Sequence, residues 1–374
     1  MTRRKEVLIP SNKKPTLLAL PLSLAVLLLV GATVSCSSDA PAPPPPPPTG
    51  ARVLSISASL KQPTAPGDLV AAIDMVYNAG ARGQFISYTW KNLEPSAGNF
   101  ALNDLSNGID YLGRTRGMRL LIGIQVINTT GKEIPTDLAG TAFDSPVMLN
   151  RFHALLDAIF PRLNGQVLYL SIGNEVDVYL ANHRAEWPAY KAFYNDALAY
   201  VHAHQPSIKV GVTATFSGAS GSTRTQVADL NSGSDIWILT YYPLGPAFVP
   251  FDPAVALTDI PAMVAMTGGR PLVLQEVGYP TSATLSSNEA QQARFVNNVY
   301  TAWSANSAAI PFLNYFALHD FSPAQCDQWG AYYGLPNDVN FKAYLCSLGL
   351  RQLDGTPKQG WQAFVDGARA TGLP

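Results

Sequence analysis

The hydrophobic positions of this chain, from residue 52 onward, fall into short continuous runs that alternate with longer amphipathic stretches. The short runs have the length of strands and few polar interruptions, which is typical of parallel strands that are covered on both faces. The pattern therefore predicts eight strands, at residues 53–57, 83–88, 119–127, 167–172, 208–214, 235–241, 272–275 and 309–316.

The amphipathic stretches carry apolar residues at three- and four-residue spacing, which predicts helices. They lie at residues 69–79, 102–115, 146–163, 189–204 and 289–307, with weaker patterns at 224–230 and 253–266. A capping box of Ser286 with Glu289 is expected to begin one of these helices. Alternation of eight such units favours an α/β fold, a single (β/α)8 barrel. The alternative is a doubly wound open sheet, but no Gly-rich phosphate turn follows the first strand.

Two of the predicted strands end in a glutamate. The fourth strand runs into Asn174 and Glu175, and the seventh runs into Glu276. Strands four and seven face each other across the mouth of such a barrel, where functional side chains gather. Alternation along the seventh strand is expected to place Leu272, Leu274 and Glu276 on one face. Two carboxyl groups that face one cleft push each other's pKa values apart, which suits glycoside cleavage, where one group protonates the leaving oxygen and the other attacks the sugar. The alternative is that each glutamate pairs with an arginine or with backbone amides.

The order of these motifs resembles that of the clan A retaining glycoside hydrolases, over the whole span from residue 52 to the end. The resemblance also rests on YTWKNLEPSAGNF at 88–100, QEVGYP at 275–280, YFALHD at 315–320 and DGTPKQGWQAF at 354–364. It implies that Glu175 is the general acid/base, that Glu276 is the nucleophile and that Asn174 binds the sugar 2-hydroxyl group. Such a mechanism requires neither a metal nor a cofactor.

The resemblance extends to further candidates for substrate binding. Tyr242 resembles the tyrosine that holds the nucleophile in this clan, and Tyr241 is the alternative. Phe316 stands where many clan members have tryptophan, and His319 follows shortly after it. Asn128 ends the third strand, where several families have histidine.

Other residues near the strand ends are candidates either for sugar binding or for packing. Glu94 is a third carboxylate near the mouth, and we interpret it as a residue that fixes its own loop. Five aromatic residues follow strand ends and are candidates for stacking on sugar rings: Trp90, Tyr179, Trp187, Tyr279 and Trp329.

The charge of the chain changes the range of expected partners. Its formal net charge is −1, and without residues 1–35 it retains 20 basic and 25 acidic residues. This balance offers no basic surface for nucleic acid. A neutral or weakly polar partner fits this charge balance better.

The first 51 residues are expected to precede the fold. Residues 1–35 combine a basic head with an apolar run at 17–30, which suits a signal peptide and is short for a membrane span. TVSC at 33–36 resembles the lipobox of bacterial lipoproteins, in which the cysteine, here Cys36, carries lipid. An ordinary signal peptide is the alternative. Residues 36–51 contain six consecutive prolines and are expected to form a stiff linker to a catalytic domain at 52–374.

The cysteines fit this interpretation of the N-terminus. With Cys36 attached to lipid, Cys326 and Cys346 remain, in an exported and oxidising compartment. We predict a disulfide between them; two free buried thiols are the alternative. The protein is thus expected to be anchored in the cell envelope, facing the periplasm or the cell surface.

These observations converge on one leading hypothesis, the retaining hydrolysis of β-glycosidic bonds by two glutamates. A carbohydrate-binding lipoprotein that has lost catalysis and a transglycosylase on the same barrel are the alternatives. Intact Asn174, Glu175 and Glu276 favour an active enzyme over a binding protein.

Overall fold

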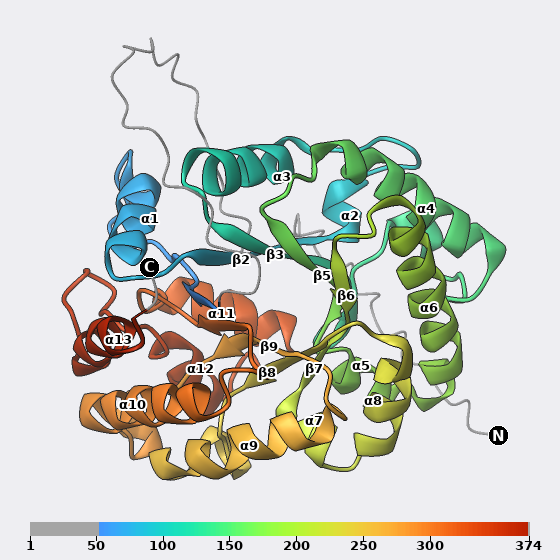
Figure 1. Ribbon diagram of the computed structural model, residues 1–374. Helices are drawn as coiled ribbons and strands as arrows, with labels where there is room; N and C mark the ends of the chain where they lie inside the picture. The colour runs from blue at the N-terminus through green and yellow to red at the C-terminus, as the bar shows by residue number, and fades with distance from the viewer. Residues whose placement is uncertain (1–51, 373–374) are drawn as a thin grey trace, which may run out of the picture.

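The computed structural model describes residues 52–372, so the predicted signal peptide, the lipidated Cys36 and the proline linker lie outside the described residues. One parallel sheet forms the centre of the fold and curls into a near-closed barrel (Figure 1). Neighbouring strands follow the order β6-β5-β3-β2-β1-β10-β9-β8-β7. They are β1 (Val53–Ile56), β2 (Gly83–Thr89), β3 (Arg119–Asn128), β5 (Val167–Asn174), β6 (Lys209–Gly211), β7 (Thr213–Thr215), β8 (Trp237–Tyr241), β9 (Leu272–Val277) and β10 (Phe312–Tyr315).

The two ends of the sheet meet at the predicted fifth strand, which is split into β6 and β7 around Val212. β6 pairs with β5, and β7 pairs with β8. A short β4 (Gly131–Lys132) adds an antiparallel pairing at the end of β3. All eight predicted strands are present, and the arrangement is TIM-like rather than a doubly wound open sheet.

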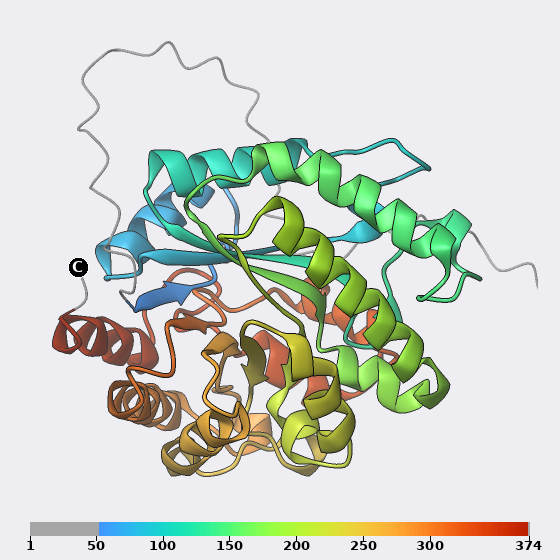
Figure 2. The ribbon, with the colours of Figure 1, turned by 45° about the vertical axis from the view of Figure 1, so that its right-hand side comes forward.

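Helices surround the barrel, with α3 and α4 on one side and α9, α10 and α13 on the other (Figures 1 and 2). Each predicted helix is present, including the weaker pattern at 224–230, and the closing helix implied by the resemblance also forms. These helices are α1 (Asp68–Asn78), α3 (Asn103–Gly108) with a π-helical continuation (Ile109–Thr115), α4 (Pro146–Ile159), α6 (Trp187–His204), α8 (Arg224–Leu230), α9 (Ala256–Met266), α10 (Glu289–Ala305) and α13 (Gln359–Ala370).

Five shorter helices were not predicted, and all of them lie in segments that follow the carboxyl ends of strands. Two of them, α11 and α12, form an excursion after β10. The five are α2 (Trp90–Leu93), α5 (Val176–Asn182), α7 (Phe216–Ser220), α11 (Pro323–Tyr332) and α12 (Val339–Cys346).

The start of α10 differs from the prediction. Its N-cap is Asn288, whose side chain accepts a hydrogen bond from the backbone amide three residues later at 2.9 Å. Ser286 lies outside the helix with φ 55°, so the predicted capping box with Glu289 is wrong. Asparagine caps a helix as well as serine does, and it stands one position before the helix. A capping box does form at the start of α11, between Ser322 and Gln325.

Two apolar layers fill the fold, one inside the barrel and one between the strands and the helices. Strand residues such as Val273 and Phe312 form a small cluster inside the barrel. Leu272 and Leu274, on the opposite face of β9, belong to the larger outer cluster that includes the helices. Within residues 52–372, no helix combines the length and the apolarity needed to cross a bilayer.

Candidate active site

A cavity of about 520 Å³ opens at the carboxyl ends of the strands. Its floor is polar and includes Asn128 at the end of β3, Asn174 at the end of β5 and Thr240 on β8. Glu175 and Glu276 also line it, and they are the only charged residues among the described residues that do so. Both predicted glutamates therefore reach one site.

Glu175 is brought into the cavity by left-handed backbone at the end of β5. Gly173 has φ 89° and Glu175 has φ 46°. A Cβ atom on Gly173 would lie 2.3 Å from the Tyr190 hydroxyl oxygen and 2.5 Å from a Val176 methyl carbon, so only glycine fits there. For a residue with a side chain, such a backbone costs about 1–2 kcal/mol, which the surrounding packing must offset.

Glu276 reaches the cavity through a β-bulge, and the predicted alternation along β9 is wrong at this point. Leu239 of β8 pairs with Leu274, but the next residue, Thr240, pairs with Glu276, so Gln275 is an extra residue. Leu274 packs outward against the helices. Strict alternation would have turned Glu276 outward with it, whereas the inserted residue turns the glutamate inward.

Two threonine hydroxyls hold the carboxylate of Glu175. Thr129 donates to Oε2 at 2.8 Å and Thr240 donates to Oε1 at 2.7 Å. Thr240 is also the register partner of Glu276, so it joins the two glutamates. Sequence reasoning missed both threonines; the only signal for Thr240 is a polar residue inside the apolar run at 237–241.

Tyr242 and Tyr241 point to different parts of the fold. The hydroxyl of Tyr242 donates to Glu276 Oε2 at 2.7 Å, inside the cavity. The hydroxyl of Tyr241 donates to Asp259 of α9 at 2.8 Å, and Tyr241 does not line the cavity. Of the two alternatives, the structure therefore places Tyr242 beside the glutamate and Tyr241 in the outer core, where it cannot bind substrate.

A ladder of side-chain amides fixes Asn174. Its Oδ1 accepts a hydrogen bond from Gln275 Nε2 at 2.8 Å, and its Nδ2 donates to Asn128 Oδ1 at 3.0 Å. Gln275 is held in turn by the hydroxyl of Thr213, at 2.7 Å. Asn174 and Asn128 thus lie together on the cavity floor, with the orientation of the Asn174 amide set by its neighbours.

Burial raises the pKa of both carboxyl groups above the ordinary range for glutamate. The negative charge of Glu175 raises the pKa of Glu276 further, while the hydrogen bond from Tyr242 opposes this rise. The hydroxyls of Thr240 and Thr129 oppose the rise for Glu175. Because two neighbouring carboxyl groups resist ionising together, one of them holds a proton at a pH where isolated glutamates would both be charged.

Asp177 anchors the short helix that begins directly after Glu175. Its carboxylate accepts hydrogen bonds from the backbone amide of Thr215 at 2.8 Å and from the Thr215 hydroxyl at 2.7 Å. Burial raises the pKa of Asp177 to about 6. These contacts tie α5 to the end of β7 and thereby support the backbone that carries Glu175.

Besides Tyr241, two more predicted binding residues do not line the cavity. Trp90 is 0% exposed, its ring packs edge-on against Phe152, and its Nε1 donates to Glu94 at 2.8 Å. His319 is 3% exposed and its ring nitrogen Nδ1 lies 2.7 Å from the carbonyl oxygen of Ser59. Both predictions are wrong, because these side chains are buried against neighbouring segments and do not line the cavity. Glu94 also accepts from the Gly98 amide at 2.8 Å, which confirms its predicted loop-fixing role.

The remaining aromatic candidates divide in the same way. Phe316 and Trp329 line the cavity. The hydroxyl of Tyr179 instead donates to Glu186. The hydroxyl of Tyr279 donates to the carbonyl oxygen of Phe251, in the loop before α9. Trp187 is buried at the start of α6. These three are structural residues in the described fold.

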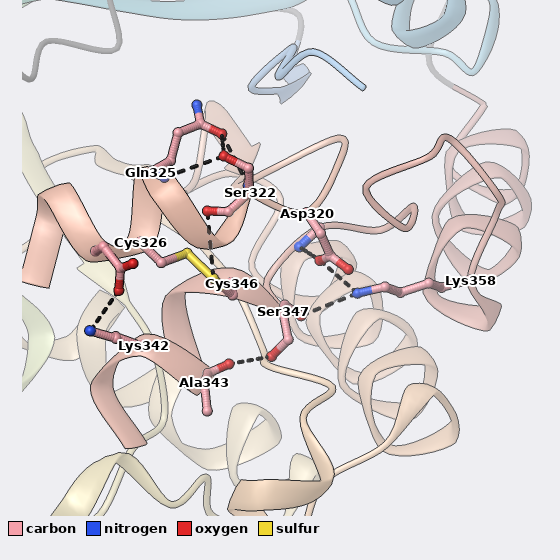
Figure 3. The surroundings of a disulfide bond; sticks show 11 residues. Asp320, Ser322, Gln325, Cys326, Lys342, Ala343, Cys346, Ser347 and Lys358 are labelled. Atoms are coloured by element: carbon pink, nitrogen blue, oxygen red, sulfur yellow. Dashed lines mark hydrogen bonds and ion pairs between the residues drawn. A yellow bond between two sulfur atoms is a disulfide. The ribbon is translucent and has the colours of Figure 1, made fainter. Parts of the chain in front are cut away.

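One side of the cavity is formed by the α11–α12 excursion, in which the predicted disulfide between Cys326 and Cys346 is present (Figure 3). Tyr332 at the end of α11 donates to Glu133 at 2.9 Å and to the Asn128 carbonyl at 3.0 Å. At its other end, Asn340 of α12 donates to the Ala247 carbonyl at 3.0 Å. The excursion thus joins the loop after β3 to the loop after β8.

The side chains that this excursion and the loop after β8 turn toward the cavity are mainly apolar. We call six of them the apolar wall: Leu244, Ala247, Phe248, Leu335, Phe341 and Leu345. Within residues 52–372, no three His, Cys, Asp or Glu side chains are grouped so that they could hold a metal ion.

Comparisons with known proteins identify the fold. Neither a protein-family profile nor a curated protein matches the chain. Among solved structures, the GH5_18 protein from Bifidobacterium longum subsp. longum is similar, with TM-score 0.65 and 13% identity over 86% of this chain and 80% of that chain. The exo-beta-1,4-mannosidase Op5Man5 from Opitutaceae bacterium strain TAV5 has TM-score 0.67 and 17% identity, over 85% and 59%. A family 39 glycoside hydrolase from Bacteroides cellulosilyticus WH2 has TM-score 0.60 and 16% identity, over 85% and 64%.

Proposed function

We propose that this protein is a glycoside hydrolase that cleaves β-glycosidic bonds with retention of configuration. The observation that carries the proposal is the meeting of Glu175 and Glu276 in one cavity, joined through Thr240. Retention requires the two carboxyl groups to be about 5–5.5 Å apart. Pairing of Thr240 with Glu276 in the sheet, together with its 2.7 Å hydrogen bond to Glu175, supports such a short separation.

The two glutamates would act in two successive displacements. In the first, Glu276 attacks the anomeric carbon and Glu175 gives its proton to the departing glycosidic oxygen. In the second, Glu175 removes a proton from water, and this water releases the sugar from Glu276. Asn174, which lines the same floor, would bind the sugar 2-hydroxyl group near Glu276.

One hydrogen bond supports the role of Glu276 as the nucleophile. Tyr242 donates to Glu276, which favours the ionised form that a nucleophile needs. Burial raises the pKa of both carboxyl groups, so the choice of Glu175 as the general acid rests on the resemblance of Asn174 and Glu175 to the motif of the clan. Hydrogen bonds from the hydroxyl groups of Thr129 and Thr240 would keep the carboxyl group of Glu175 in place during both steps.

Two structural neighbours suggest which sugars to test first. A GH5_18 variant from Bifidobacterium longum was solved in complex with Manb1-4GlcNAc, and Op5Man5 is described as an exo-beta-1,4-mannosidase. We include β-mannosides among the candidate substrates for this reason, next to β-glucosides and β-galactosides.

The test combines a substrate panel with one variant. The purified protein is assayed on aryl β-glycosides and on β-linked gluco-, manno- and galacto-oligosaccharides. The Glu276→Ala variant is expected to lose hydrolysis and to regain turnover with azide, giving a glycosyl azide of inverted configuration. Hydrolysis that survives Glu276→Ala would remove the nucleophile assignment, and binding of oligosaccharides without cleavage by the wild type would favour the carbohydrate-binding alternative. Products longer than the substrate would instead show transglycosylation.

We further propose that the protein is exported and anchored through lipid on Cys36. The basic head, the apolar run and the cysteine at its end support this, and the disulfide fits an oxidising compartment. Cells given a radioactive fatty acid are expected to label the wild-type protein and not the Cys36→Ala variant. Equal labelling of both, or labelling of neither, would contradict the anchor.

A further inference from the structure

The upper part of the cavity differs chemically from its floor. The floor offers hydroxyl, amide and carboxyl groups, as described above. Among the described residues that line the upper part, within 244–248 and 329–345, only Trp329, Tyr333 and Tyr344 have a polar atom in the side chain. The apolar wall occupies the remainder. A ligand that fills the whole cavity thus meets polar groups at one end and hydrocarbon at the other.

This division bears on the group that leaves the sugar. A second sugar ring carries several hydroxyl groups, and each one that loses water without finding a partner costs free energy. Aromatic side chains can stack on the C–H face of a sugar, but Leu335 and Leu345 have neither a stacking face nor a hydrogen-bonding group. Aliphatic side chains at this place favour a hydrocarbon leaving group over a second sugar.

The apolar wall is held in position before any ligand binds. Phe248 packs against Phe341 with ring centroids 5.1 Å apart, and stacks on Tyr344 at 5.9 Å. Asn340 ties α12 to the loop after β8, and the disulfide ties α12 to α11. Figure 3 shows this disulfide between the two helices. A preformed apolar surface binds a ligand without the cost of ordering it first.

Apolar surface also continues outside the cavity on these same segments. Val249 follows Phe248 and is 41% exposed, and Phe251 is 52% exposed. Val339, at the start of α12, is 68% exposed. These residues are half of the large hydrophobic residues that are exposed within residues 52–372. Their concentration beside the cavity is a second observation that points to an apolar ligand.

Resting on the proposed function, we propose that the substrate is a neutral β-glycoside whose leaving group is an alkyl or aryl alcohol. The sugar lies over the floor, and the hydrocarbon lies against the apolar wall. Glu276 forms a bond to the anomeric carbon as the glycosidic C–O bond breaks, and the proton of Glu175 passes to the alcohol oxygen. Water then releases the sugar, so the products are one sugar and one apolar alcohol. Anionic sugars are disfavoured, because the two glutamates are the only charged groups within residues 52–372 that line the cavity.

The test compares glycosides whose leaving alcohols have similar acidity. The purified protein is assayed on the methyl, n-hexyl and 2-phenylethyl glycosides of the preferred sugar, together with its β-linked disaccharide. Each methylene group buried in the transition state raises kcat/KM by about fourfold. We expect kcat/KM for hexyl to exceed that for methyl by at least about tenfold, which corresponds to about two buried methylene groups. The ratio of kcat/KM for the 2-phenylethyl glycoside to that for the hexyl glycoside then distinguishes a leaving alcohol with an aromatic ring from a purely alkyl one.

A pair of variants ties the effect to the apolar wall. Leu335→Asn is expected to reduce the hexyl preference, the ratio of kcat/KM for the hexyl glycoside to that for the methyl glycoside, at least threefold. Urea denaturation of this variant, compared with the wild type, reports whether the fold is intact. Val147→Asn, at an exposed position of α4, should leave the preference unchanged.

Four outcomes would count against the inference. Equal rates for hexyl and methyl, or faster cleavage of the disaccharide than of the hexyl glycoside, would overturn it while the proposed function stands. Cleavage of none of the glycosides would overturn both. An unchanged hexyl preference in Leu335→Asn would remove the apolar wall as its cause.

Discussion

The ends of β5 and β9 deliver the same chemical group to one cavity by different means. At β5, two residues with positive φ, Gly173 and Glu175, turn the chain so that the glutamate faces inward. At β9, one extra residue, Gln275, shifts the alternation so that Glu276 faces inward. One device stores strain in a left-handed backbone, and the other interrupts the pairing of two strands.

The difference teaches how each glutamate depends on its surroundings. Glu175 needs a glycine two positions before it and two threonine hydroxyls around it, one from β8 and one directly after β3. Glu276 needs no unusual residue before it, and a tyrosine from the neighbouring strand holds it. The two ends should therefore respond differently to substitution, and four experiments test this from the largest effect to the smallest.

The largest expected effect is on proton transfer at the end of β5. Glu175→Gln should lower kcat/KM for glycosides of poor leaving groups by about 10³-fold, because general acid catalysis contributes about 10²–10⁴-fold. Glycosides of 2,4-dinitrophenol, which leaves without a proton, should lose much less. Steady-state kinetics on both substrates measures the contrast. An equal loss on both would mean that Glu175 does not act as the acid.

The second experiment addresses the backbone that carries Glu175. Gly173→Ala should lower the free energy of unfolding by about 2–4 kcal/mol, since it adds a left-handed residue and a clash with the Tyr190 hydroxyl. The matched control is Gly165→Ala, where an added Cβ meets no atom within 4 Å. Urea denaturation gives both values. Equal stability of the two variants would show that the turn after β5 is not strained as described.

The third experiment addresses the support of Glu276. Tyr242→Phe removes a hydrogen bond to the ionised carboxylate, so the pKa of Glu276 should rise and the acidic limb of the kcat/KM profile should move to higher pH. A loss of about 10- to 100-fold in kcat/KM should accompany it, as for a hydrogen bond to a charged group. Tyr241→Phe, whose hydroxyl binds Asp259 instead, should leave the limb in place. A similar shift in both variants would contradict the assigned contacts.

The smallest effect concerns stability at the end of β9. Burial raises the pKa of Glu276 in the folded state, so ionising it costs the folded protein more than the unfolded chain. Wild-type stability should therefore fall as the pH rises from about 4.3, the ordinary glutamate pKa, through the raised value. Glu276→Gln avoids this loss and should be more stable than the wild type at pH 8 by on the order of 1–2 kcal/mol. This value allows for water in the cavity, which screens the charge.

The gain in Glu276→Gln should vanish at pH 4, where the wild-type carboxyl group is protonated in both states. Urea denaturation of both proteins at the two pH values measures it. A gain that is the same at pH 4 and pH 8 would have a cause other than ionisation.

Strands and most helices of the described fold follow from the sequence for a simple reason. A parallel strand buried on both faces must be a continuous apolar run, and a helix covering it must repeat at three- and four-residue spacing. The weak pattern at 224–230 becomes α8 with the same bounds. The excursion of α11 and α12 escaped prediction because its pattern is broken by Gly334 and Pro336 and its helices cover the mouth of the barrel instead of a strand.

The candidate site residues also divide into those that the sequence indicated and those that tertiary packing decided. Strand position alone indicated that Asn174, Glu175 and Glu276 end at one face of the barrel, and cysteine count with the expected compartment indicated the disulfide. Tertiary packing decided that Trp90 and His319 are buried elsewhere and that Tyr242, not Tyr241, meets a glutamate.

The sequence by itself determined where the strands lie and which polar groups stand at their ends, because burial and periodicity act locally along the chain. The direction of each of those groups was decided only by the tertiary structure. A single bulged residue reverses a side chain on β9, and a hydroxyl on β8 becomes a bridge only once the sheet has curled and brought β5, β8 and β9 around one mouth.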